Sequence, residues 1–203
     1  MRIPRLEALD IAPMNGNLIS TLSPSFSTSA LGKVAIVILG TLLLTLSAKV
    51  HVPFWPVPMT MQTFVVLVMA MACGSWIGGS IMLAYLVEGA LGLPVFSGTP
   101  ERAAGLVYMA GPTGGYLAGM LAASLIVGRL SARGWDRSPS TTLLAMLIGT
   151  FVIFGLGYAW LAVLIGPAKA WTFGVVPFVL SEALKIALAT LVLPASWRLL
   201  ERK

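Results

Sequence analysis

The sequence has few of the side chains on which disulfides and metal sites depend. Of its 203 residues, one is cysteine (Cys73) and one is histidine (His51). A single cysteine excludes an internal disulfide, and one cysteine with one histidine cannot assemble a thiolate or imidazole metal cluster. We therefore expect no bound metal, and no pattern in the sequence predicts another cofactor.

Charged residues are scarce as well. They make up 10% of the chain, whereas hydrophobic residues make up 58%; soluble domains have about 25% charged residues. The net charge of +6 does not indicate nucleic-acid binding, because the basic residues stand singly or in short clusters at the ends of apolar segments. This composition predicts a multi-pass protein whose main surroundings are the lipid bilayer of a cell membrane.

Motifs for nucleotide binding and catalysis are also missing. The sequence has no Walker motif and no glycine-rich phosphate loop, so any ATP hydrolysis that drives this protein must come from another chain. It lacks a Ser/His or Cys/His constellation and paired aspartates, which argues against an intramembrane enzyme. We predict a protein that is not an enzyme.

Six apolar segments follow one another along the chain, and a span needs about 20 mostly apolar residues. They cover residues 30–49, 61–73, 75–93, 111–130, 141–165 and 175–197. Glycine is frequent inside them, as expected where helix backbones pack closely in lipid. We predict an all-α integral membrane protein with a bundle of six transmembrane helices.

The first 29 residues are expected to precede this bundle. They lack the apolar core and the small-residue cleavage site of a secretory signal. The stretch 17–29 is rich in serine and threonine. We expect residues 1–29 to form a flexible or interfacial lead-in, and residues 30–203 to form one membrane domain.

The basic residues predict the orientation of the bundle. Nine of them stand near the start of segment one or near the ends of segments four and six: Arg2, Arg5, Lys33, Arg129, Arg133, Arg137, Arg198, Arg202 and Lys203. With six spans these lie on one side, and only Lys49, Arg102 and Lys169 lie on the other. Loops rich in Lys and Arg stay in the cytoplasm. Both termini are therefore expected in the cytoplasm, with loops 50–60, 94–110 and 166–172 outside.

The last apolar segment contains a carboxylate and an amine, Glu182 and Lys185. Ionisable side chains cost a few kcal/mol at the bilayer centre, so those retained there usually have a function or face a partner. The i,i+3 spacing places both on one face of a helix. The pair is either part of a binding site for a polar ligand or a buried ion pair that fixes helix packing, and we favour the binding site.

The outward loops hold the other unusual sequences. Three prolines, Pro53, Pro56 and Pro58, exclude a regular helix. Non-helical backbone at membrane depth is tolerated only where protein buries it or where it lines a cavity. The segment either dips into the protein or lies at the interface with Trp55 as an aromatic anchor.

Four motifs together resemble one family. PVPMTMQTF (56–64), GLPVFSG (92–98), GPTGGY (111–116) and PFVLSEALK (177–185) are similar in order and spacing to those of BioY, the biotin-binding S component of energy-coupling factor (ECF) transporters. The resemblance covers residues from about 30 to the C-terminus. It implies a six-helix fold of the ECF S-component type in the bacterial plasma membrane, with a vitamin site that opens outward. Glu182 stands where the family usually has aspartate, while Lys185 is retained.

The resemblance also implies a ligand, biotin, and two kinds of partner: a transmembrane coupling protein and ABC-type ATPase subunits. A buried carboxylate can accept hydrogen bonds from the ureido N–H groups of biotin, and an ammonium group can hold an oxygen. We expect Glu182 and Lys185 to do this. The remaining predicted ligand contacts are neutral hydrogen bonds from Thr60 and Gln62 and packing of the rings by Trp55, Phe96 and Tyr116.

These observations predict a membrane-embedded subunit that captures biotin from the outside for ATP-driven uptake with its partners. The alternative is a stand-alone secondary transporter or facilitator for biotin or a related small vitamin. In that case Glu182 and Lys185 would relay protons or ions. The absence of detectable inverted repeats argues mildly against this alternative.

Overall fold

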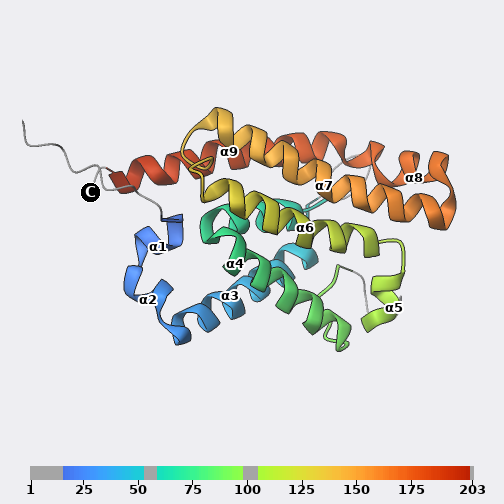
Figure 1. Cartoon of the computed structure of the whole chain (residues 1–203). Coiled ribbons are helices and arrows are strands. Elements are labelled where there is room, and N and C mark those ends of the chain that lie inside the picture. The colour runs from blue at the N-terminus through green and yellow to red at the C-terminus, as the bar shows by residue number, and fades with distance from the viewer. Residues whose placement is uncertain (1–15, 53–58, 98–104, 202–203) are drawn as a thin grey trace, which may run out of the picture.

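The computed structural model describes residues 16–52, 59–97 and 105–201, and within them the protein is built almost entirely of helices (Figure 1). The helices are α1 (Leu18–Leu22), α2 (Pro24–Thr28), α3 (Ala30–Lys49), α4 (Gln62–Ala90), α5 (Gly105–Ala110), α6 (Gly114–Ser131), α7 (Pro139–Ile165), α8 (Pro167–Gly174) and α9 (Val179–Glu201). A 3₁₀ turn, η1 (Val176–Phe178), joins α8 to α9. Two short strands, β1 (His51–Val52) and β2 (Met59–Thr60), pair antiparallel. The predicted all-helical class is confirmed.

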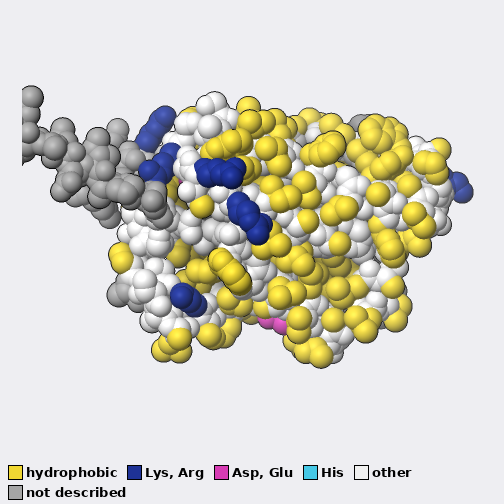
Figure 2. All heavy atoms as spheres, viewed as in Figure 1, with side chains coloured by type: hydrophobic (Ala, Val, Ile, Leu, Met, Phe, Trp, Pro, Cys, Tyr) yellow, Lys and Arg dark blue, Asp and Glu magenta, His cyan; other side chains and the backbone are white. Residues whose placement is uncertain are grey.

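Five of these helical stretches are long and apolar enough to cross a bilayer: α3, α4, α6, α7, and α8 with α9 together. Their outer faces are apolar, with Leu31, Phe151 and Val163 each about four-fifths exposed. Figure 2 shows hydrophobic side chains spread over much of the visible surface. Such a surface is stable in contact with lipid tails but not in contact with water. The fold therefore indicates that the protein lies in the bilayer.

Helix α4 is sharply bent at Gly74, whose φ of 78° and ψ of 173° lie outside the helical region. The two halves turn back along each other, as Figure 1 shows. A Cβ added to Gly78 would lie 2.9 Å from Cα of Ala70, eight residues earlier. In a straight helix those residues would be about 12 Å apart. The predicted segments 61–73 and 75–93 are thus two arms of one element.

Only glycine suits the corner of α4. A positive φ near 78° is costly for residues with a Cβ, and a Cβ at Gly74 would overlap the side-chain amide of Asn17. That amide donates a 3.0 Å hydrogen bond to the carbonyl of Cys73, which the broken helix leaves without its usual partner. Gly128 of α6 packs against the backbone of Ser75 on the other side of the corner.

Helix α6 lies between α4 and α7, and α7 lies between α6 and the α8–α9 pair. Small residues allow the backbones to approach: a Cβ on Gly119 would lie 2.8 Å from Cα of Ile153, and one on Gly115 would lie 2.6 Å from the carbonyl oxygen of Leu156. Close contact of this kind replaces the hydrophobic driving force that is absent between helices in lipid.

Two of the expected outer loops differ from the structure. Residues 166–172 were expected to form a loop, yet α8 begins at Pro167 directly after a turn at Gly166 with φ of 87°. That prediction was wrong because proline at the first position of a helix favours its start. The loop 94–110 contains α5 near its end. The proline-rich segment with Trp55 lies outside the described residues.

Basic side chains gather at one end of the molecule, where α9 finishes (Figure 2). Arg129 is in the last turn of α6 and Arg198 is in the last turn of α9. The indole of Trp197 donates a 2.7 Å hydrogen bond to Asp136 in the α6–α7 connection, which brings these two helix ends together.

Candidate functional site

The charged pair expected on α9 is formed, and it is almost completely buried. Nζ of Lys185 lies 2.7 Å from Oε1 of Glu182, and each residue is 6% exposed. Thr63 of α4 completes a triangle: its hydroxyl donates to Oε1 of Glu182 over 2.9 Å and accepts from Lys185 over 3.1 Å. The pair therefore joins α9 to the first arm of α4.

This triangle leaves hydrogen-bonding capacity unused. Lys185 has three N–H groups, of which two are bonded to Glu182 and Thr63. All the hydrogen bonds that Glu182 accepts within the described residues go to Oε1, so Oε2 has none. A buried carboxylate with a spare oxygen beside an ammonium group can accept an N–H from a ligand while its own charge stays compensated.

Gln62 begins a second polar chain next to this triangle. Its side-chain amide donates to the hydroxyl of Tyr85 over 3.0 Å, and that hydroxyl donates to the carbonyl of Val95 over 2.9 Å. Gln62 is 6% exposed and Tyr85 is fully buried. The chain attaches the segment after α4 to both arms of that helix.

Phe96 is held in an aromatic cluster above this chain. Its ring stacks on Tyr108 with centroids 4.8 Å apart and meets the edge of Tyr85 at 5.5 Å. The hydroxyls of Ser97 and Tyr108 lie 3.0 Å apart. A cavity of about 50 Å³ is lined here by Gln62, Phe96 and Tyr116 together. It has room for about one or two waters, so a bicyclic ligand would need the 93–97 segment to move.

The other predicted contact residues lie around this cluster. Tyr116 lines the small cavity and donates its hydroxyl to the carbonyl of Gly174 over 2.8 Å, which ties α6 to α8. Thr60 is on β2 opposite His51, is half-buried, and lines neither this cavity nor the groove described next. Trp55 lies outside the described residues.

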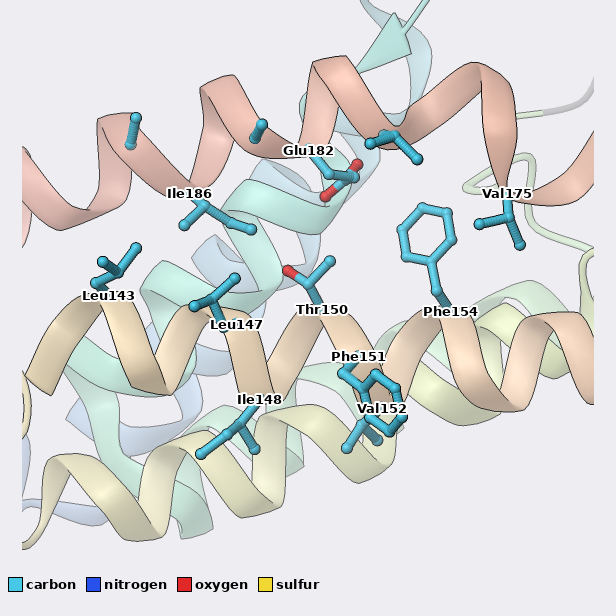
Figure 3. A pocket seen from close by; sticks show the side chains of 13 residues that line it. Leu143, Leu147, Ile148, Thr150, Phe151, Val152, Phe154, Val175, Glu182 and Ile186 are labelled. Carbon is cyan, nitrogen blue, oxygen red and sulfur yellow. The ribbon is translucent and has the colours of Figure 1, made fainter.

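A larger groove of about 790 Å³ runs between α7 and α9, and Glu182 lies on its wall (Figure 3). Most of its lining is aliphatic or aromatic, including Phe154, Val175 and Ile186. The polar exceptions are Glu182 and Thr150, which come from opposite helices. The groove and the triangle therefore share the carboxylate.

These features can now be compared with known proteins. Residues 19–202 match the sequence model of the BioY family. The chain belongs to the BioY family. A protein of Pyrococcus horikoshii named as a probable biotin transporter BioY is 36% identical over 160 residues, covering 79% of this chain and 93% of its own length. The biotin transporter BioY of Thermotoga maritima is 34% identical over 153 residues, covering 75% and 88%.

A solved structure has the same fold. It is described as the S-component for biotin from an ECF-type ABC transporter, and it superposes with a TM-score of 0.65 at 19% sequence identity. The match covers 82% of this chain and 90% of the other. The S-component type of helical bundle expected for this BioY protein is thus confirmed at the level of fold.

Three side chains that the sequence did not single out belong to the site region: Thr63, Tyr85 and Tyr108. Thr63 stands next to Gln62 inside the PVPMTMQTF motif, so that motif gave a signal for it. Tyr85 lies in α4 and Tyr108 lies in α5, and only their contacts with Phe96 distinguish them.

Proposed function

We propose that this BioY protein is the membrane-embedded subunit that binds biotin from the outer side for ATP-driven uptake by partner subunits. The observation that carries the proposal is the buried triangle of Glu182, Lys185 and Thr63. It lies at the wall of a groove large enough for a vitamin, in a chain whose relatives are named biotin transporters.

The chemistry of the ligand matches this site. Biotin presents two ureido N–H donors and one carbonyl on an apolar bicyclic body, with a flexible carboxylate tail. Oε2 of Glu182 can accept one ureido N–H, and the third N–H of Lys185 can donate to an oxygen. An apolar pocket with a few placed polar groups is the usual form of a small-molecule site. Gln62, Thr60, Tyr116, Trp55 and Phe96 complete the proposed set of contact residues.

The proposed topology has six spans, to which α4 contributes two, and both termini in the cytoplasm. Two observations support it. The two arms of α4 fold back on each other, as the packing of Gly78 on Ala70 and the hydrogen bond from Gln62 to Tyr85 indicate. The Arg-rich ends of α6 and α9 also lie together, and such ends are usually cytoplasmic. The aromatic cluster around Phe96 then lies on the outer side.

The partners are a transmembrane coupling protein and ABC-type ATPases. The sequence has no nucleotide-binding motif of its own, and the solved structure with the same fold is described as a component of an ECF-type ABC transporter. The ion pair between Glu182 and Lys185 leaves secondary transport as the rival, since intramembrane charge pairs also relay protons.

Two measurements test the proposal. Isothermal titration of the purified chain in nanodiscs should show saturable biotin binding and no ATP hydrolysis. Uptake of labelled biotin by cells should require co-expressed coupling and ATPase subunits and should survive a protonophore while ATP is maintained. Uptake by the chain alone that collapses with the protonophore would establish the secondary-transport alternative.

A further inference from the structure

The hydroxyl of Thr150 on α7 is unusual among the helical threonines that the structure describes. Its Oγ1 is buried and has no hydrogen-bond partner among the described residues. Threonine in a helix normally satisfies its hydroxyl with the carbonyl four residues earlier. Thr45, Thr142, Thr172 and Thr190 all do so, at 2.7–3.0 Å. A buried hydroxyl without a partner is unfavourable and needs an explanation. A ligand that hydrogen-bonds this hydroxyl only when it is bound would provide one.

The surroundings of Thr150 identify where that group would lie. Thr150 lines the groove between α7 and α9, and it also lines a small cavity whose wall includes Glu182 and Lys185. Figure 3 shows the side chains of Thr150 and Glu182 extending from α7 and α9 into the space between the two helices. Thr150 and Glu182 therefore line one otherwise apolar groove, and each has an oxygen that accepts no hydrogen bond from the described residues. The Thr150 hydroxyl is covered, so its side chain must rotate about χ1 to present this oxygen to a ligand in the groove.

We infer that Thr150 is a specificity-determining residue that hydrogen-bonds the ligand, and that the polar head of the ligand lies between α7 and α9. This inference rests on the proposed function. A cyclic urea presents N–H donors on both sides of one carbonyl. Glu182 accepts from one N–H, while the Thr150 hydroxyl accepts from the other or donates to the carbonyl oxygen. Phe154 and Ile186 then cover the apolar body of the ligand.

The groove needs no polar group if lipid tails alone fill it, because an acyl chain offers no hydrogen bond. A hydroxyl left unpaired against lipid would have only a cost, and valine, which has nearly the same shape, would serve there better. The pairing of Thr150 with Glu182 across the groove thus favours a ligand with donors and acceptors in its head over a lipid.

The first test replaces Thr150 with valine and measures both biotin affinity and thermal stability in nanodiscs. Loss of one neutral hydrogen bond should weaken binding by about three- to tenfold. The melting temperature of the ligand-free protein should stay the same or rise, because an unpaired hydroxyl has been removed. Thr150→Ser should bind like the parent. Thr190→Val is the matched control, since that hydroxyl bonds to Ile186 within α9.

The second test fills the groove. Ala183→Trp places a large ring in the groove, while Leu184→Trp changes the neighbouring exposed residue, which does not line it. Ala183→Trp should abolish binding and Leu184→Trp should not. If the parent binds biotin but Thr150→Val and Ala183→Trp bind equally well, the ligand lies elsewhere and the inference is wrong. If the parent itself does not bind biotin, the proposed function fails instead.

Discussion

The amide of Gln62 donates a 3.0 Å hydrogen bond to the hydroxyl of Tyr85, 23 residues later in the same helix. A straight helix would separate the two residues by about 34 Å, so the contact exists only because α4 folds back at Gly74. The same hydroxyl bonds to the carbonyl of Val95. One tyrosine therefore links both arms of α4 and the segment that carries Phe96.

Replacing Tyr85 with phenylalanine should destabilise the protein. The change removes one hydroxyl and leaves the buried amide of Gln62 and the carbonyl of Val95 unpaired, which costs about 1–3 kcal/mol. The melting temperature in detergent should fall, and biotin affinity should fall with it because the 93–97 segment loosens. Tyr158→Phe is the control, since Tyr158 is half-buried and packs edge-on to Trp171. Equal melting temperatures for the two variants would contradict this role.

Replacing Lys185 with methionine should weaken biotin binding by about ten- to hundredfold, because a charge-assisted hydrogen bond is worth about 1.5–3 kcal/mol. It also leaves the Glu182 carboxylate without its ammonium partner, so the single variant alone is ambiguous.

The double variant Glu182→Leu, Lys185→Met removes both charges and resolves this ambiguity. A ligand-binding pair predicts that the double variant folds and still binds biotin poorly. A scaffolding pair predicts recovery of both folding and binding. Titration of biotin into the parent, the single variant and the double variant separates the two outcomes.

Gly74→Ala should lower stability by more than an ordinary glycine substitution in a helix. The φ of 78° is unfavourable for alanine, and its Cβ would meet the Asn17 side chain. Strained backbone of this kind costs about 1–3 kcal/mol. Gly155→Ala provides the matched control, because a Cβ there would meet nothing within 4 Å and no positive φ is involved. Thermal unfolding of both variants gives the comparison, and equal behaviour would exclude strain at the corner.

Stability should depend on the ionisation of Asp136, which lies between α6 and α7 outside the spans. The residue is 1% exposed, and desolvation raises the pKa of its carboxyl above the ordinary 3.8, although the Trp197 hydrogen bond and Arg137 oppose the shift. A carboxyl whose folded pKa is raised stabilises the fold fully below its unfolded pKa. This contribution is lost as pH rises through the folded pKa.

The melting temperature of the parent should therefore fall, relative to that of Asp136→Asn, as pH rises from about 4 to about 7. Differential scanning fluorimetry of both proteins over this range measures the difference. A difference that does not change with pH would show that Asp136 titrates as it does in the unfolded chain.

The proposed orientation predicts opposite accessibility for two exposed residues. In a Cys73→Ser background, Ser140→Cys at the start of α7 should react with a membrane-impermeant maleimide only in inverted vesicles. Lys169→Cys in α8 should react only in right-side-out cells. Both positions are exposed, and Cys73 is buried. Labelling of both residues from the same side would mean that α7 does not place them on opposite sides of the membrane, and the proposed topology would be wrong.

Local features of the sequence were sufficient to predict the long helices and the charged pair. Runs of apolar residues marked the five long helical stretches that could cross a membrane. The i,i+3 spacing predicted that Glu182 and Lys185 share one helix face, and their charged atoms lie 2.7 Å apart. The helix after Gly166 was missed, because hydropathy does not register a proline that begins a helix.

Contacts between distant segments could not be predicted in the same way. Thr63 reaches Glu182 across 119 residues, and Thr150 faces it from another helix. Neither contact follows from a repeating spacing in the sequence, because the residues lie on different helices. Thr60 was selected because it lies in the same motif as Gln62; it pairs with His51 in the β1–β2 hairpin, and its contact with the ligand stays a prediction.

The corner at Gly74 also affects how the chain is made. Residues 62–90 form one predominantly apolar helical stretch of 29 residues, which the insertion machinery could accept as a single crossing with tilt. Whether the stretch enters as one crossing or as a hairpin sets the direction of every later helix, because each added crossing reverses the next. Relative to the proposed six-span topology, a chain inserted with α4 straight would have its later helices reversed and the Glu182 site turned toward the cytoplasm. In the proposed topology, the turn between the two crossings of α4 is formed at Gly74 and is held by Asn17, which is synthesised before it.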